Sequence, residues 1–144
     1  MPVLTFQQRH LRPTLSGKKR STVRQARAVP RAMRPGAALT MQFGRRDAPT
    51  TLDTTITAVD LYPLLDWYEA LEAREEAQAG SVPFIDLTGA ELHAAIRAAA
   101  DAEGVRLVTL AERLETPLER LLSELIEADR RVIYEVFWDA VTPR

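Results

Sequence analysis

The spacing of apolar residues changes twice along this chain, and this change limits the possible folds more than any other feature. Up to about residue 61, apolar and polar residues alternate over short runs such as Ala37–Phe43, which indicates strands with one buried face. Between residues 64 and 128 the apolar residues recur every three or four positions, which indicates helices. Strand-like alternation returns in Arg131–Trp138, where both faces are expected to be at least partly covered. The sequence therefore predicts an α+β fold, a small open barrel of about five to six mostly antiparallel strands with helices inserted before the last strand.

The first half of the chain is expected to carry most of the strands. These are Val3–Phe6, Ser21–Gln25, Ala37–Phe43 and Leu52–Leu61, the last with Ile56 and Val59 buried. Gln8–Ser16 is predicted to form a short helix or helical turn, in which Pro13 must lie in the first turn or break the helix, and Gly17 permits the turn that follows. The arginine-rich stretch Ala26–Pro35 is predicted to be a loop.

The second half is expected to be mainly helical, with Pro83–Leu87 as a short extended piece. Three stretches have capping-box spacing, in which a threonine precedes a glutamate by three residues, and each predicts a helix start. The expected helices are Leu64–Gln78, Gly89–Glu103, a short one from Thr109, and Thr116–Ala128 with Pro117 at its first position and four leucines inward, at 118, 121, 122 and 125. The second helix ends its apolar row on Glu103, at a helix C-terminus.

The bulk composition is that of an ordinary globular protein. At 144 residues the chain is long enough for one domain, predicted over 1–144, with 46% hydrophobic and 27% charged residues. It has no cysteine, which excludes disulfides and thiolate zinc sites. No signal-like pattern opens it and no apolar run approaches the roughly 18 residues of a membrane span. We therefore expect a cytoplasmic protein without a membrane partner.

The net charge of −1 hides a strong asymmetry between the two halves. Residues 1–50 contain eleven Lys and Arg and a single acid, Asp47, so they carry +10, and residues 51–144 carry −11. Two explanations stay open. The halves can neutralise each other within one fold, or the first half can bind a phosphate or nucleic-acid ligand.

Few residue types suited to catalysis are present. The two histidines, His10 and His93, lack metal-ligand spacing, and no phosphate-binding glycine loop occurs, so neither a metal nor a nucleotide cofactor is expected. The remaining candidates are Lys19, Thr22, Arg24 and Glu103. In a strand, Thr22 and Arg24 share one face and Val23 points into the core.

These candidates could form a catalytic site with a threonine nucleophile if burial and nearby charges shift their pKa values. A threonine hydroxyl needs a neighbouring base, and Lys19 can serve only if burial and nearby cations lower its pKa. A partly buried Glu103 at a helix C-terminus would suit proton transfer. From the residues alone, the plainer interpretation is a solvated basic strand and an exposed glutamate, or a core network without catalysis.

Four short motifs, in order along the chain, resemble the opening of an ASCH domain, whose fold is the PUA-like barrel. They are Leu4-Thr5-Phe6-Gln7-Gln8-Arg9, Leu15-Ser16-Gly17-Lys18-Lys19, Ser21-Thr22-Val23-Arg24 and Arg34-Pro35-Gly36. The segment is most similar to the small bacterial N4-acetylcytidine amidohydrolases of that superfamily, and Ala102-Glu103-Gly104-Val105 resembles their downstream glutamate segment. The chain departs from them by a helix around 64–78 and a longer helical region at 116–128.

The resemblance implies an amidohydrolase that cleaves N4-acetylcytidine, or a related N4-acylated cytosine nucleoside, to cytidine and a carboxylate. It implies Lys19, Thr22 and Glu103 as the catalytic set, with Arg24 and Arg9 binding the substrate or the oxyanion, and no cofactor. The alternative is an RNA-binding or RNA-cleaving module that uses the basic residues Arg27, Arg31, Arg34, Arg45 and Arg46. The scarcity of aromatic residues in the first fifty, only Phe6 and Phe43, argues against base stacking by such a module.

Overall fold

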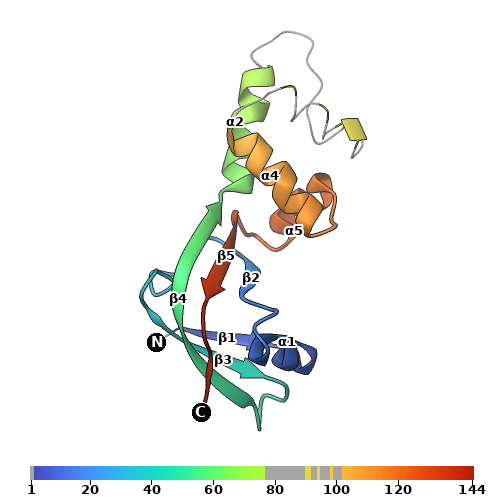
Figure 1. The fold of residues 1–144 in the computed structure, drawn as a ribbon. Coiled ribbons are helices and arrows are strands. Elements are labelled where there is room, and N and C mark those ends of the chain that lie inside the picture. Colours follow the sequence, from blue (N-terminus) through green and yellow to red (C-terminus); the bar gives the residue numbers. More distant parts are fainter. Residues whose placement is uncertain (1, 77–89, 92–93, 95–97, 99–101) are drawn as a thin grey trace. The chain divides into compact units, whose positions relative to one another are not determined.

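The computed structural model describes residues 2–76, 90–91, 94, 98 and 102–144 (Figure 1). The chain divides into two compact units, which are treated separately below. Unit 1 comprises residues 1–24, 29–61 and 134–144, and unit 2 comprises residues 25–28 and 62–133. The prediction of one domain over 1–144 stays a prediction.

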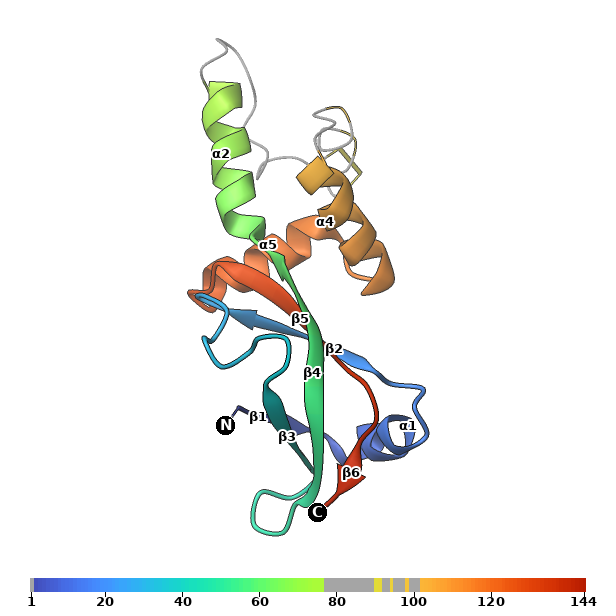
Figure 2. The same ribbon diagram turned by 60° about the vertical axis from the view of Figure 1, so that its left-hand side comes forward.

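The strands form one mixed sheet that curls into a half-barrel (Figures 1 and 2). Its strands are β1 (Val3–Phe6), β2 (Ser21–Ala26), β3 (Ala38–Phe43), β4 (Thr50–Tyr62), β5 (Val132–Trp138) and β6 (Thr142–Pro143). Their order is β1-β3-β4-β5-β2, and β6 pairs with β4. The β1–β3 pair is parallel, whereas β3–β4 and β4–β6 are antiparallel. The predicted α+β class and number of strands are confirmed.

The alternating pattern of the first half produces the core of unit 1. Leu39, Met41 and Phe43 on β3 are fully buried, and Leu52 and Ile56 continue the core on β4. Val59 was predicted to be buried, but it is only half-buried. The chain end is tied to this core by β6, where Arg144 donates to Asp53 Oδ1 at 2.8 Å.

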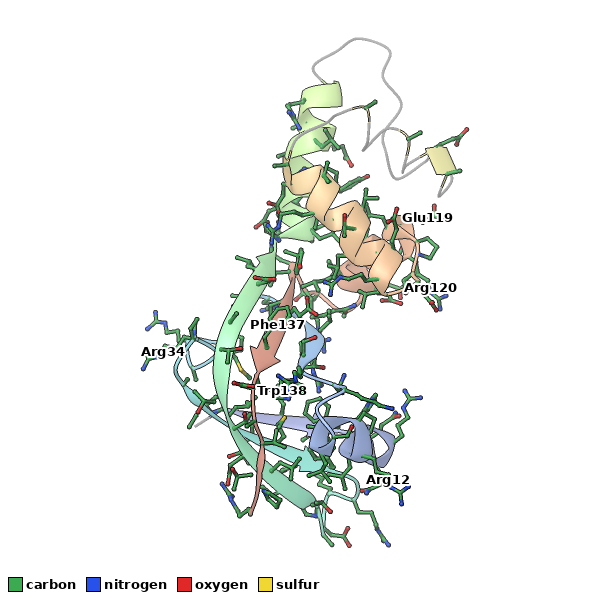
Figure 3. All side chains as sticks on the ribbon, in the orientation of Figure 1. Arg12, Arg34, Glu119, Arg120, Phe137 and Trp138 are labelled. Atoms are coloured by element: carbon green, nitrogen blue, oxygen red, sulfur yellow. The ribbon has the colours of Figure 1, made fainter. Side chains whose placement is uncertain are left out.

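The local predictions around β1 and β2 hold closely. A 3-10 turn, η1 (Gln8–His10), leads into α1 (Leu11–Leu15), and Pro13 lies in its first turn, as expected. The stretch 27–37 between β2 and β3 contains no helix or strand, as the basic-loop prediction required. Figure 3 shows Arg12 on α1 and Arg34 on this loop directed away from the strands.

Unit 2 contains the helices α2 (Leu64–Glu76), α4 (Ala102–Arg113) and α5 (Leu118–Glu127). The four leucines predicted to face inward on α5 are buried, at positions 118, 121, 122 and 125. The predicted extended piece Pro83–Leu87 and most of Gly89–Glu103 lie outside the described residues.

Two predicted helix boundaries in unit 2 are wrong. Glu103 does not end a helix, because α4 runs from Ala102 through it to Arg113, with Gly104 buried inside the helix. Thr109 does not start a helix either. Its hydroxyl donates to the carbonyl of Val105 one turn earlier at 2.9 Å, which an internal threonine can do without breaking the helix. At the start of α5 the cap is Pro117 and no side chain caps it, so the predicted capping box at Thr116 is also wrong.

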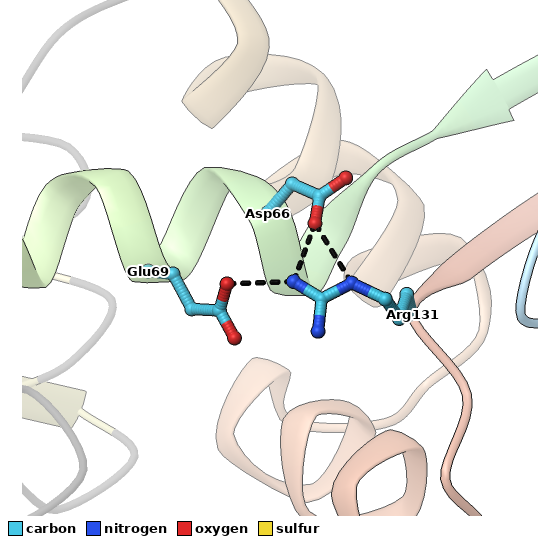
Figure 4. A network of polar contacts seen from close by, with 3 residues as sticks. All are labelled: Asp66, Glu69 and Arg131. Carbon is cyan, nitrogen blue, oxygen red and sulfur yellow. Dashed lines mark hydrogen bonds and ion pairs between the residues drawn. The ribbon is translucent and has the colours of Figure 1, made fainter.

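Charged side chains join the start of α2 to the residue before β5 (Figure 4). The Arg131 Nη2 atom lies 2.6 Å from Asp66 Oδ1 and 2.6 Å from Glu69 Oε2, and Nε donates to Asp66 at 3.0 Å. Asp66 and Glu69 are three residues apart and therefore share one face of α2. Both carboxylates raise the pKa of Arg131 above its usual value.

Among the described residues, no helix is both long enough and apolar enough to span a bilayer.

Candidate active site

Thr22 and Arg24 lie on β2, next to β5. Two backbone hydrogen bonds fix the pair, from Trp138 N–H to Arg20 O and from Arg131 N–H to Ala26 O, both at 3.0 Å. Along these two bonds the residue number on β2 rises while that on the β5 side falls, so the two strands run antiparallel. Thr22 is buried, with 9% of its surface exposed. Val23 was predicted to point into the core but is only half-buried, so Thr22 lies on the more deeply covered face.

The turn after α1 positions Lys19. Gly17 has a φ of +81°, a conformation that glycine adopts without strain. The turn is closed by Lys19 N–H to Pro13 O at 2.9 Å and by Arg20 Nε to Gly17 O at 3.0 Å. These bonds hold the backbone of Lys19 at the entrance to β2.

The Phe6 ring lies at the centre of the candidate site. It stacks on Phe43 with centroids 4.9 Å apart and meets the edge of Trp138, which Figure 3 marks on β5, at 6.1 Å. Two cations lie over the same ring, Arg24 with its guanidinium carbon 4.9 Å from the centroid and Lys19 with its ammonium nitrogen at 6.0 Å. We call these five residues the Phe6 cluster. It brings two of the predicted site residues, Lys19 and Arg24, to one aromatic ring.

Arg24 is held on one side only. Its Nη2 donates to the Thr5 carbonyl at 2.8 Å, whereas its buried Nε has no hydrogen-bond partner among the described residues. A buried donor without a partner costs about 1–3 kcal/mol, so such groups often serve a ligand. Burial lowers the pKa of Arg24 and the neighbouring Tyr134 raises it.

The surroundings of Lys19 favour its neutral amine. Burial lowers the pKa of Lys19 below its usual value, Arg24 lowers it further, and Glu135 raises it. The lowering is the change that a lysine needs to act as a base. The pKa of His10 is affected by the same cations. Burial lowers its pKa, and Lys19, Arg9 and Arg24 lower it further.

Arg9 lies on η1 with an exposed side chain, close enough to His10 to lower the pKa of that ring. Of the other predicted site residues, Glu103 belongs to unit 2. It is in the first turn of α4 and accepts from Arg106 Nη1 at 3.1 and 3.3 Å, with 31% of its side chain exposed. Its predicted convergence with Lys19 and Thr22 stays a prediction.

Sequence reasoning missed a carboxylate inside unit 1. Glu135, at the middle of β5, is 2% exposed and accepts from Ser21 Oγ at 2.9 Å. A signal for it was present, since Glu135 is the only charged residue of a strand whose pattern predicts two covered faces. Tyr134 beside it was also missed. Burial raises the pKa of its hydroxyl, and Arg24 lowers it.

The arrangement has the parts of an acyl-transfer site: a buried hydroxyl, a lysine with a lowered pKa and an arginine with a donor to spare. Within the described residues, no three His, Asp or Glu side chains are grouped to hold a metal ion.

Comparison of the chain with protein-family models, with curated proteins and with solved structures finds no match in any of the three.

Proposed function

We propose that this protein is an ASCH-like amidohydrolase with a PUA-like barrel. It cleaves the N4-acyl amide of N4-acetylcytidine, or of a related N4-acylated cytosine nucleoside, to give cytidine and a carboxylate. One observation carries the proposal: Lys19, whose pKa is lowered by burial and by Arg24, lies two residues before the strand on which Thr22 offers a buried hydroxyl. A hydroxyl with a neighbouring base is the requirement for a threonine nucleophile.

The proposed reaction begins with proton transfer from Thr22 to the neutral amine of Lys19. The Thr22 Oγ1 atom then bonds to the acyl carbon, and the carbonyl oxygen takes the negative charge. The unpartnered Nε of Arg24 is a donor for this oxyanion, and one such donor is typically worth about a hundredfold to a thousandfold in rate. The bond to the exocyclic nitrogen breaks as that nitrogen receives the proton that Lys19 took from Thr22. Glu103 either passes this proton on or orients Lys19, whose ammonium then delivers it. Water then releases the carboxylate from Thr22.

A variant of this mechanism uses the same residues differently. Lys19 and Glu103 activate a water molecule that attacks the acyl carbon directly, and Thr22 positions the substrate. The two routes differ in whether an acyl group is ever bonded to Thr22. Mass spectrometry of the protein stopped by acid during turnover distinguishes them, because only the first route adds an acyl mass.

The test is loss of the acylcytosine absorbance when the protein is incubated with N4-acetylcytidine. Thr22→Ala, Lys19→Ala and Glu103→Gln are each expected to lower kcat/KM by at least about a hundredfold, the usual result of removing a nucleophile or a general base. Thr22→Ser keeps a hydroxyl and is expected to retain activity.

Two matched controls separate chemistry from folding. Thr54 is 9% exposed, like Thr22, but its hydroxyl donates to Ala140 O, so Thr54→Val is expected to keep turnover. Arg106→Gln breaks the Glu103–Arg106 ion pair without removing the carboxylate. Equal losses in Arg106→Gln and Glu103→Gln would assign Glu103 a structural role, and full activity in all three site variants would discard the site.

RNA binding is the second candidate, favoured by the charge of unit 1. That unit has eleven Lys and Arg against five Asp and Glu, a net +6, whereas unit 2 carries −7. Arg45 and Arg46 also line a cavity of about 360 Å³ with Thr5 and Gln42. Arg27, in contrast, belongs to unit 2 and pairs with Asp129.

The RNA alternative is tested by the affinity of the protein for a short single strand as salt is raised. Several phosphate contacts give a steep linear fall of log K with log salt. Absence of binding at low salt would rule this alternative out.

A further inference from the structure

Glu135 is a charged residue in a place where charge is costly. It is the fourth of seven residues in β5, and only 2% of it is exposed. Removing an ionised carboxylate from water costs several kcal/mol unless other groups compensate. One compensating group is the hydroxyl of Ser21, which donates to Glu135 Oε2 at 2.9 Å. This bond links the middle of β5 to the first residue of β2.

The same carboxylate acts on Lys19, two residues before Ser21. The charged groups that influence Lys19 come from different elements. Arg24 on β2 opposes its positive charge, Glu135 on β5 favours it, and His10, which precedes α1, is itself affected by Lys19. Glu135 is the acidic residue in this set. Lys19, whose ammonium nitrogen lies over the Phe6 ring, is therefore subject to opposite influences from a cation and a carboxylate.

We propose that Glu135 is a positioning residue of this site, which holds the entrance of β2 through Ser21 and supplies the counter-ion for the ammonium form of Lys19. The inference rests on the proposed function. When Lys19 accepts the proton of Thr22, one positive and one negative charge form, the ammonium and the oxyanion. The ammonium forms next to Arg24, and the negative charge of the Glu135 carboxylate offsets that repulsion.

This assignment divides the work between two carboxylates. Orienting Lys19 falls to Glu135, within unit 1. For Glu103, the role that remains is delivery of a proton to the leaving exocyclic nitrogen. The two glutamates should then differ in their effects on the pH dependence, since only Glu135 acts through Lys19.

The composition of the chain allows a direct test, because Lys18 and Lys19 are its only lysines. Lysine labelled with ¹³C at Cε gives two side-chain signals, which Lys18→Arg assigns. In Glu135→Gln, Lys19 is expected to titrate about one pH unit lower than in the wild type, because a nearby negative charge is lost. Asp139→Asn is the matched control. It removes a carboxylate four residues away that pairs with Arg20 at the surface, and it is expected to leave Lys19 unchanged.

The pH profile of turnover gives the second readout. Because the base must be neutral, kcat/KM falls at low pH. Glu135→Gln is expected to move this acid limb to lower pH by the same amount as the Lys19 titration. The plateau of kcat/KM at higher pH is expected to be lower as well. A merely structural role would lower the plateau without moving the limb. Glu135→Asp, which keeps the charge, is expected to hold the limb near that of the wild type. If Glu135→Gln does not fold, Glu135→Met removes the charge without burying an amide and serves the same test.

The two proposals fail in different ways. If the wild-type protein does not hydrolyse N4-acetylcytidine but Glu135→Gln still shifts the Lys19 titration, the proposed function is wrong and the pairing stands. If hydrolysis is observed but the Lys19 titration is the same in Glu135→Gln as in the wild type, the role of Glu135 is overturned.

Discussion

Replacing Phe6 by leucine tests whether the aromatic ring at the centre of the candidate site also stabilises unit 1. The change keeps an apolar side chain but removes the ring contacts of Phe6 with Phe43, Trp138 and His10 and with the cations of Arg24 and Lys19. An aromatic pair contributes about 0.5–1.5 kcal/mol beyond its buried area, and a partly buried cation over a ring contributes about 1 kcal/mol. The aromatic pairs with Phe43 and Trp138 and one cation together give an expected loss of about 2–4 kcal/mol.

For a chain of 144 residues, an unfolding entropy of roughly 0.3 kcal/mol/K converts this loss into a fall in Tm of about 10 °C. Urea unfolding followed by circular dichroism measures the free energy directly. Leu4→Met is the matched control on the same strand, since Leu4 is similarly buried and has no aromatic ring to lose. It is expected to cost less than about 1.5 kcal/mol.

A double-mutant cycle isolates the contribution of the cation. Phe6→Leu, Arg24→Gln and the double variant are expected to give a coupling free energy of about 1 kcal/mol. A Phe6→Leu loss no larger than that of Leu4→Met, or a coupling indistinguishable from zero, would refute the reasoning. Arg24 would then lie near the ring without being held by it.

Two further predictions concern unit 2. Leu125 on α5 is fully buried, so Leu125→Ala is expected to lower the free energy of unfolding in urea by about 2–5 kcal/mol. The neighbouring Ile126 is 47% exposed, so Ile126→Ala is expected to cost under about 1 kcal/mol, and equal losses would mean that α5 packs by another face. Arg131→Gln is expected to lower Tm at low salt, with the difference shrinking near 1 M salt because exposed ion pairs are screened. Arg130→Gln is the control for it, and an equal, salt-independent effect of both variants would contradict the network with Asp66 and Glu69.

The sequence predicted the α+β class and most of the described strands and helices because the relevant signals are local. A strand buried on one face must alternate, so Val3–Phe6 and the buried face of Leu39, Met41 and Phe43 could be derived without coordinates. The burial of Thr40 on the other face of β3 could not. The same holds for the inward leucines of α5. The helix end at Glu103 was wrong because Gly104, a residue type that often ends helices, lies inside α4. The helix start at Thr109 was wrong because capping-box spacing also occurs inside helices, where the hydroxyl bonds back to the preceding turn.

In the candidate site, too, the residues close together in sequence could be predicted and the distant ones could not. Lys19, Thr22 and Arg24 were identified from one short segment, whose residues are neighbours in any fold that makes it a strand. Their partners could not be identified in that way. Phe6 reaches Arg24 across 18 positions of sequence, and Glu135 reaches Ser21 across 114.

By itself, then, the sequence determined the elements with regular periodicity, the charge asymmetry and the residues able to carry chemistry. Only the tertiary structure decided which of those residues share an environment. The pairing of β2 with β5 places a buried carboxylate beside the entrance to β2, and the packing of β1 places an aromatic ring under two cations. The physical reason is that burial and nearby charge set the proton affinity of Lys19, and both depend on segments that are far away along the chain.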